Sequence, residues 1–177
     1  AKAGERVRAY IREHPEILPQ AMERLQQRDM NARLAPIRGE VAKPFPGAVL
    51  GNPKGTRTLV EFTDYGCGYC RQSLADVQAL IAADPQLKVV IREFPILSPD
   101  SLTAARMALA AAEQGKYAAF HKAMFAAGRP APATIRAAAQ KAGLDMARAE
   151  KVAASDAVDA ELRRTMQLAE ALGFSGT

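Results

Sequence analysis

Both cysteines of the chain lie at the end of the segment Glu61-Phe62-Thr63-Asp64-Tyr65-Gly66-Cys67-Gly68-Tyr69-Cys70. The residues from Thr58 to Tyr65 are mostly β-branched or aromatic, which predicts a strand. The cysteines follow this strand and begin the next helix. Because a helix N-terminus carries unpaired N–H groups and the positive end of the helix dipole, it favours a thiolate at Cys67. We therefore predict that Cys67 attacks disulfides and that Cys70 resolves the mixed disulfide.

The chain after this segment predicts an α/β domain. Leu87 to Ile96 resembles the first strand in composition, and the residues between the two strands predict a helix that ends at Asp84-Pro85. Such a crossover implies parallel strands. The alanine-rich residues 101–172 are interrupted at Gly115, Gly128 and Gly143, which predicts about four further helices, the last of which starts after an N-cap such as Asp145.

The first third of the chain predicts a helical appendage. Helices are expected at roughly 4–13 and 16–33, separated at Pro15. One apolar stripe runs along them and needs a partner, either the main domain or another copy of the chain. A Pro- and Gly-rich stretch then places a domain boundary near Lys43. The stripe comprises Val7, Ile11, His14, Leu18, Met22 and Leu25.

Composition excludes several classes of protein. The 177 residues, 49% hydrophobic, suit one domain with an extension, and no uninterrupted apolar run is long enough to span a membrane. The net charge of +5 is spread along the chain, which argues against nucleic-acid binding. A tetrahedral zinc site needs four ligands, and the chain has no second cysteine pair. Its two histidines are His14 and His121, and we assign neither a role. We expect no metal and no dissociable cofactor.

The segment from Glu61 to Cys70 resembles the active-site segment of the DsbA-like branch of the thioredoxin superfamily. The resemblance implies a thioredoxin-like domain over residues 44–177, interrupted by an all-helical insertion at about 101–172. Members of that family continue with a cis-proline, two strands and a closing helix after the position of Thr177, so we expect the chain to be a fragment. The residue before that proline contacts substrate, which implies substrate binding by Thr177.

The helical segment from Tyr10 to Leu18 is similar to the ScsC subgroup, the suppressor-of-copper-sensitivity proteins C. This resemblance implies that residues 1–43 mediate homo-oligomerisation. It also implies an exported periplasmic protein whose signal peptide has been removed, with disulfide- or thiol-containing proteins as substrates. A membrane-bound redox partner must then reset the cysteines.

The dipeptide Gly68-Tyr69 matches the C-G-Y-C motif of periplasmic disulfide isomerases, whereas DsbA has C-P-H-C. Tyrosine adds no positive charge beside the thiolate, so we expect a weaker oxidant than DsbA and isomerase or reductase activity. A monomeric DsbA-type dithiol oxidase is one alternative. A copper-handling protein or chaperone that uses the same thiols is another.

Two further residues are candidates for the site. Glu61 is an acid in an otherwise apolar strand, six positions before Cys67, and could exchange protons with Cys70 if it is buried beneath the motif. An ordinary solvent-facing strand residue is the alternative. Tyr69 could contact substrate from within the motif, although that position could equally tolerate a residue without a role.

Overall fold

A computed structural model describes residues 2–177, which form two units that meet between Arg38 and Gly39. The first unit contains α1 (Lys2–Glu13), α2 (Ile17–Leu34) and the 3₁₀ turn η1 (Ala35–Ile37). The predicted break at Pro15 is confirmed, although Pro15 lies in the turn and Glu16 takes the N-cap position of α2. Neither α1 nor α2 contains a buried residue.

The second unit is built around a three-stranded sheet in the order β1-β3-β2, within the described residues. It begins at Gly39, within α3 (Arg38–Val41), and continues with β1 (Val49–Gly51), β2 (Arg57–Thr63), α4 (Gly68–Ala83) and β3 (Leu87–Glu93). The predicted parallel pairing of β2 with β3 across α4 is confirmed, and β1 pairs antiparallel with β3.

Both long strands end earlier than predicted. After β2, Asp64 directs its side chain to backbone N–H groups of the following turn, and shortly after β3, Pro95 has no N–H to donate to a ladder. The strands therefore stop at Thr63 and Glu93.

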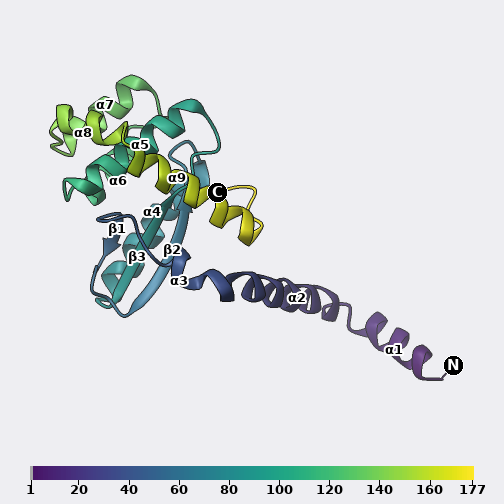
Figure 1. Ribbon diagram of the computed structural model, residues 1–177. Helices are drawn as coiled ribbons and strands as arrows, with labels where there is room; N and C mark the ends of the chain where they lie inside the picture. Colours follow the sequence, from purple (N-terminus) through teal and green to yellow (C-terminus); the bar gives the residue numbers. More distant parts are fainter. Residues whose placement is uncertain (1) are drawn as a thin grey trace. The chain divides into compact units, whose positions relative to one another are not determined.

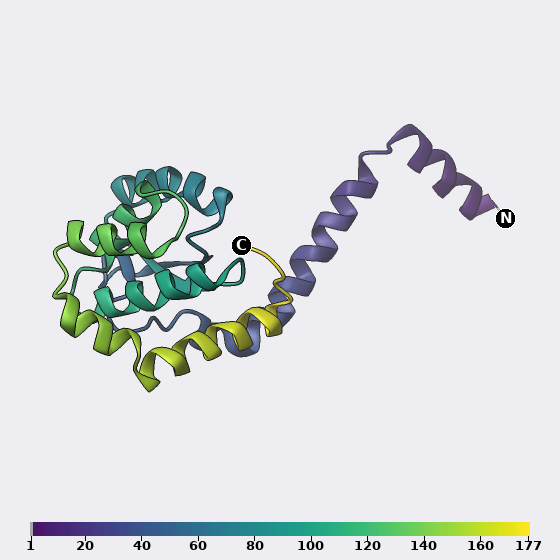
Figure 2. The ribbon, with the colours of Figure 1, turned by 90° about the horizontal axis from the view of Figure 1, so that it is seen from above.

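Five helices follow in the alanine-rich region, where about four were predicted. They are α5 (Pro99–Glu113), α6 (Tyr117–Ala126), α7 (Pro132–Lys141), α8 (Met146–Ala153) and α9 (Asp156–Leu172). Asp145 caps α8 as predicted. Helix α5 packs on α6 and α8, and α6 packs on α7, so that α5 to α8 gather on one side of the domain (Figure 1). After α9 the chain turns back toward the middle of the domain (Figure 2).

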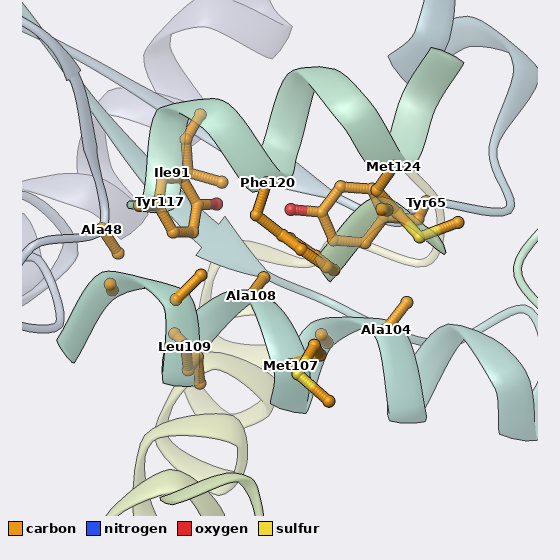
Figure 3. Packing of buried hydrophobic residues seen from close by; sticks show 14 of the residues in the cluster. Ala48, Tyr65, Ile91, Ala104, Met107, Ala108, Leu109, Tyr117, Phe120 and Met124 are labelled. Atoms are coloured by element: carbon orange, nitrogen blue, oxygen red, sulfur yellow. The ribbon is translucent and has the colours of Figure 1, made fainter. Parts of the chain in front are cut away.

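Small residues on α5 let the helical layer approach the sheet closely. Its alanines from Ala104 to Ala112 are buried, and side chains from β3 and α6 fill the space above them (Figure 3). The aromatic ring of Tyr65, from the turn after β2, packs among these residues and is completely buried. The active-site turn is therefore anchored in the main core.

The fully buried Arg92 of β3 binds the start of the domain. Its Nε donates to the carbonyl oxygen of Val41 (3.1 Å), and Nη2 donates to those of Glu40 and Lys43. Its Nη1 pairs with Glu161 of α9 at 2.6 Å. These bonds explain why the second unit begins at Gly39, a few residues before the boundary predicted near Lys43.

We expect Arg92→Met to lower the free energy of unfolding by about 3–5 kcal/mol, because it leaves the Glu161 carboxylate and three carbonyl groups without their partner. Urea denaturation would measure the change. Arg57→Met, which removes an exposed ion pair with Asp84, should cost less than about 1 kcal/mol. Equal costs for the two variants would contradict the role given to Arg92.

Candidate active site

Cys67 is the N-cap residue of α4. Its backbone is extended, and its Sγ accepts a hydrogen bond from the backbone N–H of Cys70 at 3.4 Å. Its own N–H donates to the carbonyl oxygen of Asp64 at 2.9 Å, which closes the turn between β2 and α4. Both cysteines are free thiols and nearly buried, with 6% and 5% of their surfaces exposed. The strand, turn and helix thus hold the two sulfur atoms at one helix end.

The two thiols differ in acidity. Burial of Cys67 opposes ionisation, but its interactions with Thr177, Cys70 and Tyr69 outweigh burial and lower the pKa of Cys67. Cys70 is more deeply buried, and at this residue burial outweighs the hydrogen bonds and raises the pKa of the thiol. A low-pKa thiol followed by a high-pKa thiol suits a nucleophile and a resolving group, because only the first is primed as a thiolate.

The structure places Tyr69 and Thr177 beside Cys67. The Tyr69 side chain projects into solvent with 79% of its surface exposed. The carbonyl oxygen of Thr177 lies 3.4 Å from Cys67 Sγ, although the two residues are 110 positions apart. Both are therefore near any molecule that binds the nucleophile, and their roles in substrate binding stay predictions.

Glu61 is half-buried on β2 and faces α4. Its Oε1 accepts a hydrogen bond from the Ser73 hydroxyl at 3.0 Å, and the same hydroxyl lies 3.0 Å from the carbonyl oxygen of Cys70. Burial raises the pKa of Glu61, which Ser73 partly offsets. Ser73 thus connects Glu61 to the backbone of Cys70, and proton exchange with the Cys70 thiol stays a prediction.

Asp64, which the sequence analysis did not single out, organises the turn before Cys67. Its Oδ1 accepts from the N–H of Gly66 at 2.7 Å, and its Oδ2 accepts from the N–H groups of Ile96 and Leu97 at 2.9 Å each. The buried carboxylate thus joins the cysteine turn to the loop after β3. An acid near the end of a predicted strand of mostly β-branched and aromatic residues was the available signal.

A buried polar network lies behind the same turn. The Tyr117 hydroxyl donates to Glu93 Oε1 at 2.6 Å and the Tyr65 hydroxyl donates to the same oxygen at 3.1 Å. The Tyr65 oxygen also lies 3.0 Å from His121 Nδ1. Figure 3 shows the two tyrosine hydroxyls pointing toward one another from either side of Phe120. The network links β3, α6 and the cysteine turn.

Burial determines the charges in this network. It raises the pKa of Glu93 to about 8, against the opposing effect of the tyrosine hydrogen bonds, and lowers the pKa of His121 to about 4. Both side chains are therefore neutral near pH 7. The sequence analysis assigned no role to either residue, although Glu93, like Glu61, is an acid in an apolar strand.

The surface beside Cys67 is hollowed into a pocket of about 440 Å³. Its walls carry the opposite charges of Asp100 and Arg129, together with the apolar Leu97 and Pro130, next to Gly66.

Within residues 2–177, no three His, Cys, Asp or Glu side chains cluster as metal ligands. No helix in the same range is long and apolar enough to cross a membrane.

Comparison with known families identifies two regions of the chain. Residues 58–177 match the model of the DSBA-like thioredoxin domain, and residues 3–32 match the copper resistance protein ScsC N-terminal domain. A curated sequence, the Na⁺/H⁺ antiporter NhaA 3 of Salinispora tropica, is 29% identical over 132 residues. That match covers 73% of this chain but only 20% of the antiporter sequence.

Solved structures share the fold. A thioredoxin-like oxidoreductase from Silicibacter pomeroyi is 46% identical, with a TM-score of 0.70 over 73% of this chain and 75% of the other. BcfH of Salmonella enterica Typhimurium is 31% identical, with a TM-score of 0.72 over 99% and 80%. Proteus mirabilis ScsC, in a compact conformation, is 22% identical, with a TM-score of 0.74 over 100% and 92%, and supports the fold alone.

We expect the two thiols to react with iodoacetamide at different pH values. In Cys70→Ser the remaining Cys67 should reach half its maximal rate below the ordinary thiol pKa of 9.0, whereas in Cys67→Ser the remaining Cys70 should do so above it. Alkylation rates followed by mass spectrometry would show both midpoints. Coinciding midpoints would contradict the assignment of Cys67 as the nucleophile.

We also expect Glu93 to make the fold less stable as pH rises. Its pKa in the folded chain, about 8, exceeds the ordinary 4.5, so the folded state holds the proton more tightly and loses that advantage as pH rises toward 8. Between about pH 6.5 and pH 8.5 the loss should be roughly 2 kcal/mol, and Glu93→Gln should abolish it.

Urea denaturation of a Cys67→Ser/Cys70→Ser background would isolate this effect from thiol ionisation. The exposed Glu170 provides the matched control, since Glu170→Gln should keep the pH dependence. If the free energy of unfolding of Glu93→Gln still falls with pH as in the background protein, another group must titrate.

Proposed function

Since the chain belongs to the DsbA-like thioredoxin family of thiol-disulfide oxidoreductases, we propose that it is a periplasmic protein disulfide isomerase or reductase. The observation that carries this proposal is the unequal pair of thiols at the N-terminus of α4. Cys67 attacks a disulfide of the client protein and forms a mixed disulfide. Cys70 then displaces the client, or the client's own thiol does so during isomerisation.

The residues inside the motif favour isomerisation or reduction over oxidation. Stabilising the Cys67 thiolate makes a disulfide a stronger oxidant, because it favours the reduced form. Here the pKa of Cys67 is lowered by interactions with Thr177, Cys70 and the backbone of Tyr69, and the exposed Tyr69 side chain adds no charge. An intermediate potential suits an enzyme that must release non-native disulfides as well as form them.

The helices of the first unit support an oligomer. Large apolar side chains along α1 and α2 are exposed in the single chain, although such a stripe normally packs against a partner. A second copy of the same segment would cover them and bring two active sites to one client. The exposed fractions are 58% for Val7, 56% for Tyr10, 53% for Leu18, 56% for Met22 and 47% for Leu25.

Location in the periplasm agrees with the chemistry, because disulfides persist in oxidising compartments. In this proposal a membrane-bound protein resets the cysteines and no dissociable cofactor takes part. Tyr69 and Thr177, on either side of the nucleophile, contact the client.

Reactivation of a scrambled, wrongly disulfide-bonded protein tests the proposal. We compare the full chain with one that begins at Gly39, which keeps the carbonyl groups bound by Arg92. We expect reactivation by the full chain, loss of activity in Cys67→Ser, and a drop of several-fold without residues 1–38. Sedimentation of both chains would show whether the oligomer is lost together with activity.

Other outcomes would point to the alternatives. Rapid oxidation of a reduced client without reactivation would identify a DsbA-type oxidase. Stoichiometric copper binding that requires Cys67, with no exchange activity, would identify a copper-handling protein. A point variant such as Leu18→Lys controls for the truncation, since it changes the stripe and leaves the domain intact.

A further inference from the structure

Two buried oxygen atoms of the sheet have no hydrogen-bond partner within residues 2–177. They are Thr63 Oγ1 and Glu93 Oε2, on the last residues of β2 and β3. Thr63 is completely buried and Glu93 is 2% exposed. Buried polar groups without partners are rare in proteins, and a bound water commonly satisfies them. Two such atoms at one place therefore require a physical explanation.

Strand pairing places the two side chains next to one another. Thr63 is the register partner of Glu93, and the N–H of Phe94 donates to the carbonyl oxygen of Thr63 at 2.8 Å. Paired residues on neighbouring strands lie about 5 Å apart and point to the same face. A water molecule between Thr63 Oγ1 and Glu93 Oε2 would satisfy both.

Thr63 also connects this position to the site. Its side chain interacts with the Cys70 thiol and lowers the pKa of that thiol, although Oγ1 makes no hydrogen bond of standard geometry. Glu61, by contrast, reaches only the backbone carbonyl of Cys70, through Ser73. Of the two acids, Glu93 is the one whose register partner interacts with the sulfur atom.

We propose that Glu93 exchanges a proton with the Cys70 thiol through the Thr63 hydroxyl and a water molecule bound between Thr63 and Glu93. The inference rests on the proposed exchange through Cys67 and Cys70. It adds a residue that the sequence analysis did not assign.

The step balances in both directions. When a client thiolate attacks Cys67 of the disulfide form, the new sulfur–sulfur bond forms, the Cys67–Cys70 bond breaks, and Cys70 leaves as a thiolate. The Glu93 proton then moves through the water and Thr63 to Cys70, which leaves a carboxylate. In the reverse direction Cys70 returns the proton to Glu93 and attacks the mixed disulfide, releasing the client thiolate.

The groups around Glu93 keep its carboxyl group protonated and able to donate that proton. Tyr65 and Tyr117 both donate to Oε1, so the acid proton belongs on Oε2, which faces the proposed water. Asp64 and Glu61 repel a charge on Glu93, and His121 is neutral. A neutral carboxylic acid near pH 7 is the form that can protonate a leaving thiolate.

The test follows the reaction of the wild-type disulfide form with reduced glutathione, using acid quenching and mass spectrometry between about pH 6 and pH 9. We expect Glu93→Gln to be slower by about tenfold near neutral pH, with the difference shrinking as Glu93 of the wild type ionises. Thr63→Val should show the same pattern. Thr165→Val is the matched control, since it removes another buried hydroxyl without a partner, on α9, and should react like the wild type.

Equal rates for wild type and Glu93→Gln at every pH would overturn the inference and leave the exchange reaction intact. A pH-dependent loss of the reaction rate in Glu61→Gln, without such a loss in Glu93→Gln, would also overturn the inference. A wild type that does not react with glutathione would remove the proposed exchange and this inference together. If Glu93→Gln does not fold, infrared spectra of the wild type test the proposal instead. The band of a protonated carboxyl group should shift when the disulfide is reduced, and an unchanged band would contradict the proposal.

Discussion

The hydrogen bond from the Cys70 N–H to Cys67 Sγ is the interaction on which the site depends. It makes the nucleophile the N-cap of α4, so the sulfur accepts a bond that a serine or aspartate side chain accepts at most helix starts. The same bond favours the thiolate over the thiol, because an anion accepts hydrogen bonds more strongly. Local helix capping and chemical reactivity are therefore one property of this residue.

The rest of the domain fixes the direction of that helix start. Asp64 joins the turn before Cys67 to the loop after β3, and Tyr65 anchors the same turn in the core beneath α6. Both residues are almost fully buried, so the turn cannot move without disrupting packing or leaving polar groups unpaired. The direction of the helix start, and with it the position of the Cys67 sulfur, is therefore set by the core.

The fold and the placement of the two cysteines at a helix start could be predicted because they depend on local patterns. Strand composition, the Asp84-Pro85 stop and the spacing of the cysteines all lie within short windows. The network around Glu93 could not be predicted, because Tyr65, Glu93, Tyr117 and His121 meet only after β2, β3 and α6 have packed. The contacts of Arg92 with carbonyl groups about fifty residues away could not be predicted for the same reason.

Buried ionisable groups in a small sheet reduce stability unless they are paired, and their surroundings indicate what compensates for that cost. Arg92 is offset by an ion pair and carbonyl acceptors on one face of β3, so it stabilises the structure. Glu93, the next residue on the opposite face, has no cation beside it and retains one oxygen without a partner. A core selected for stability alone would place an apolar side chain there. The acid instead lies at the end of β3, where its register partner Thr63 interacts with the Cys70 thiol and its proton can serve the exchange proposed above.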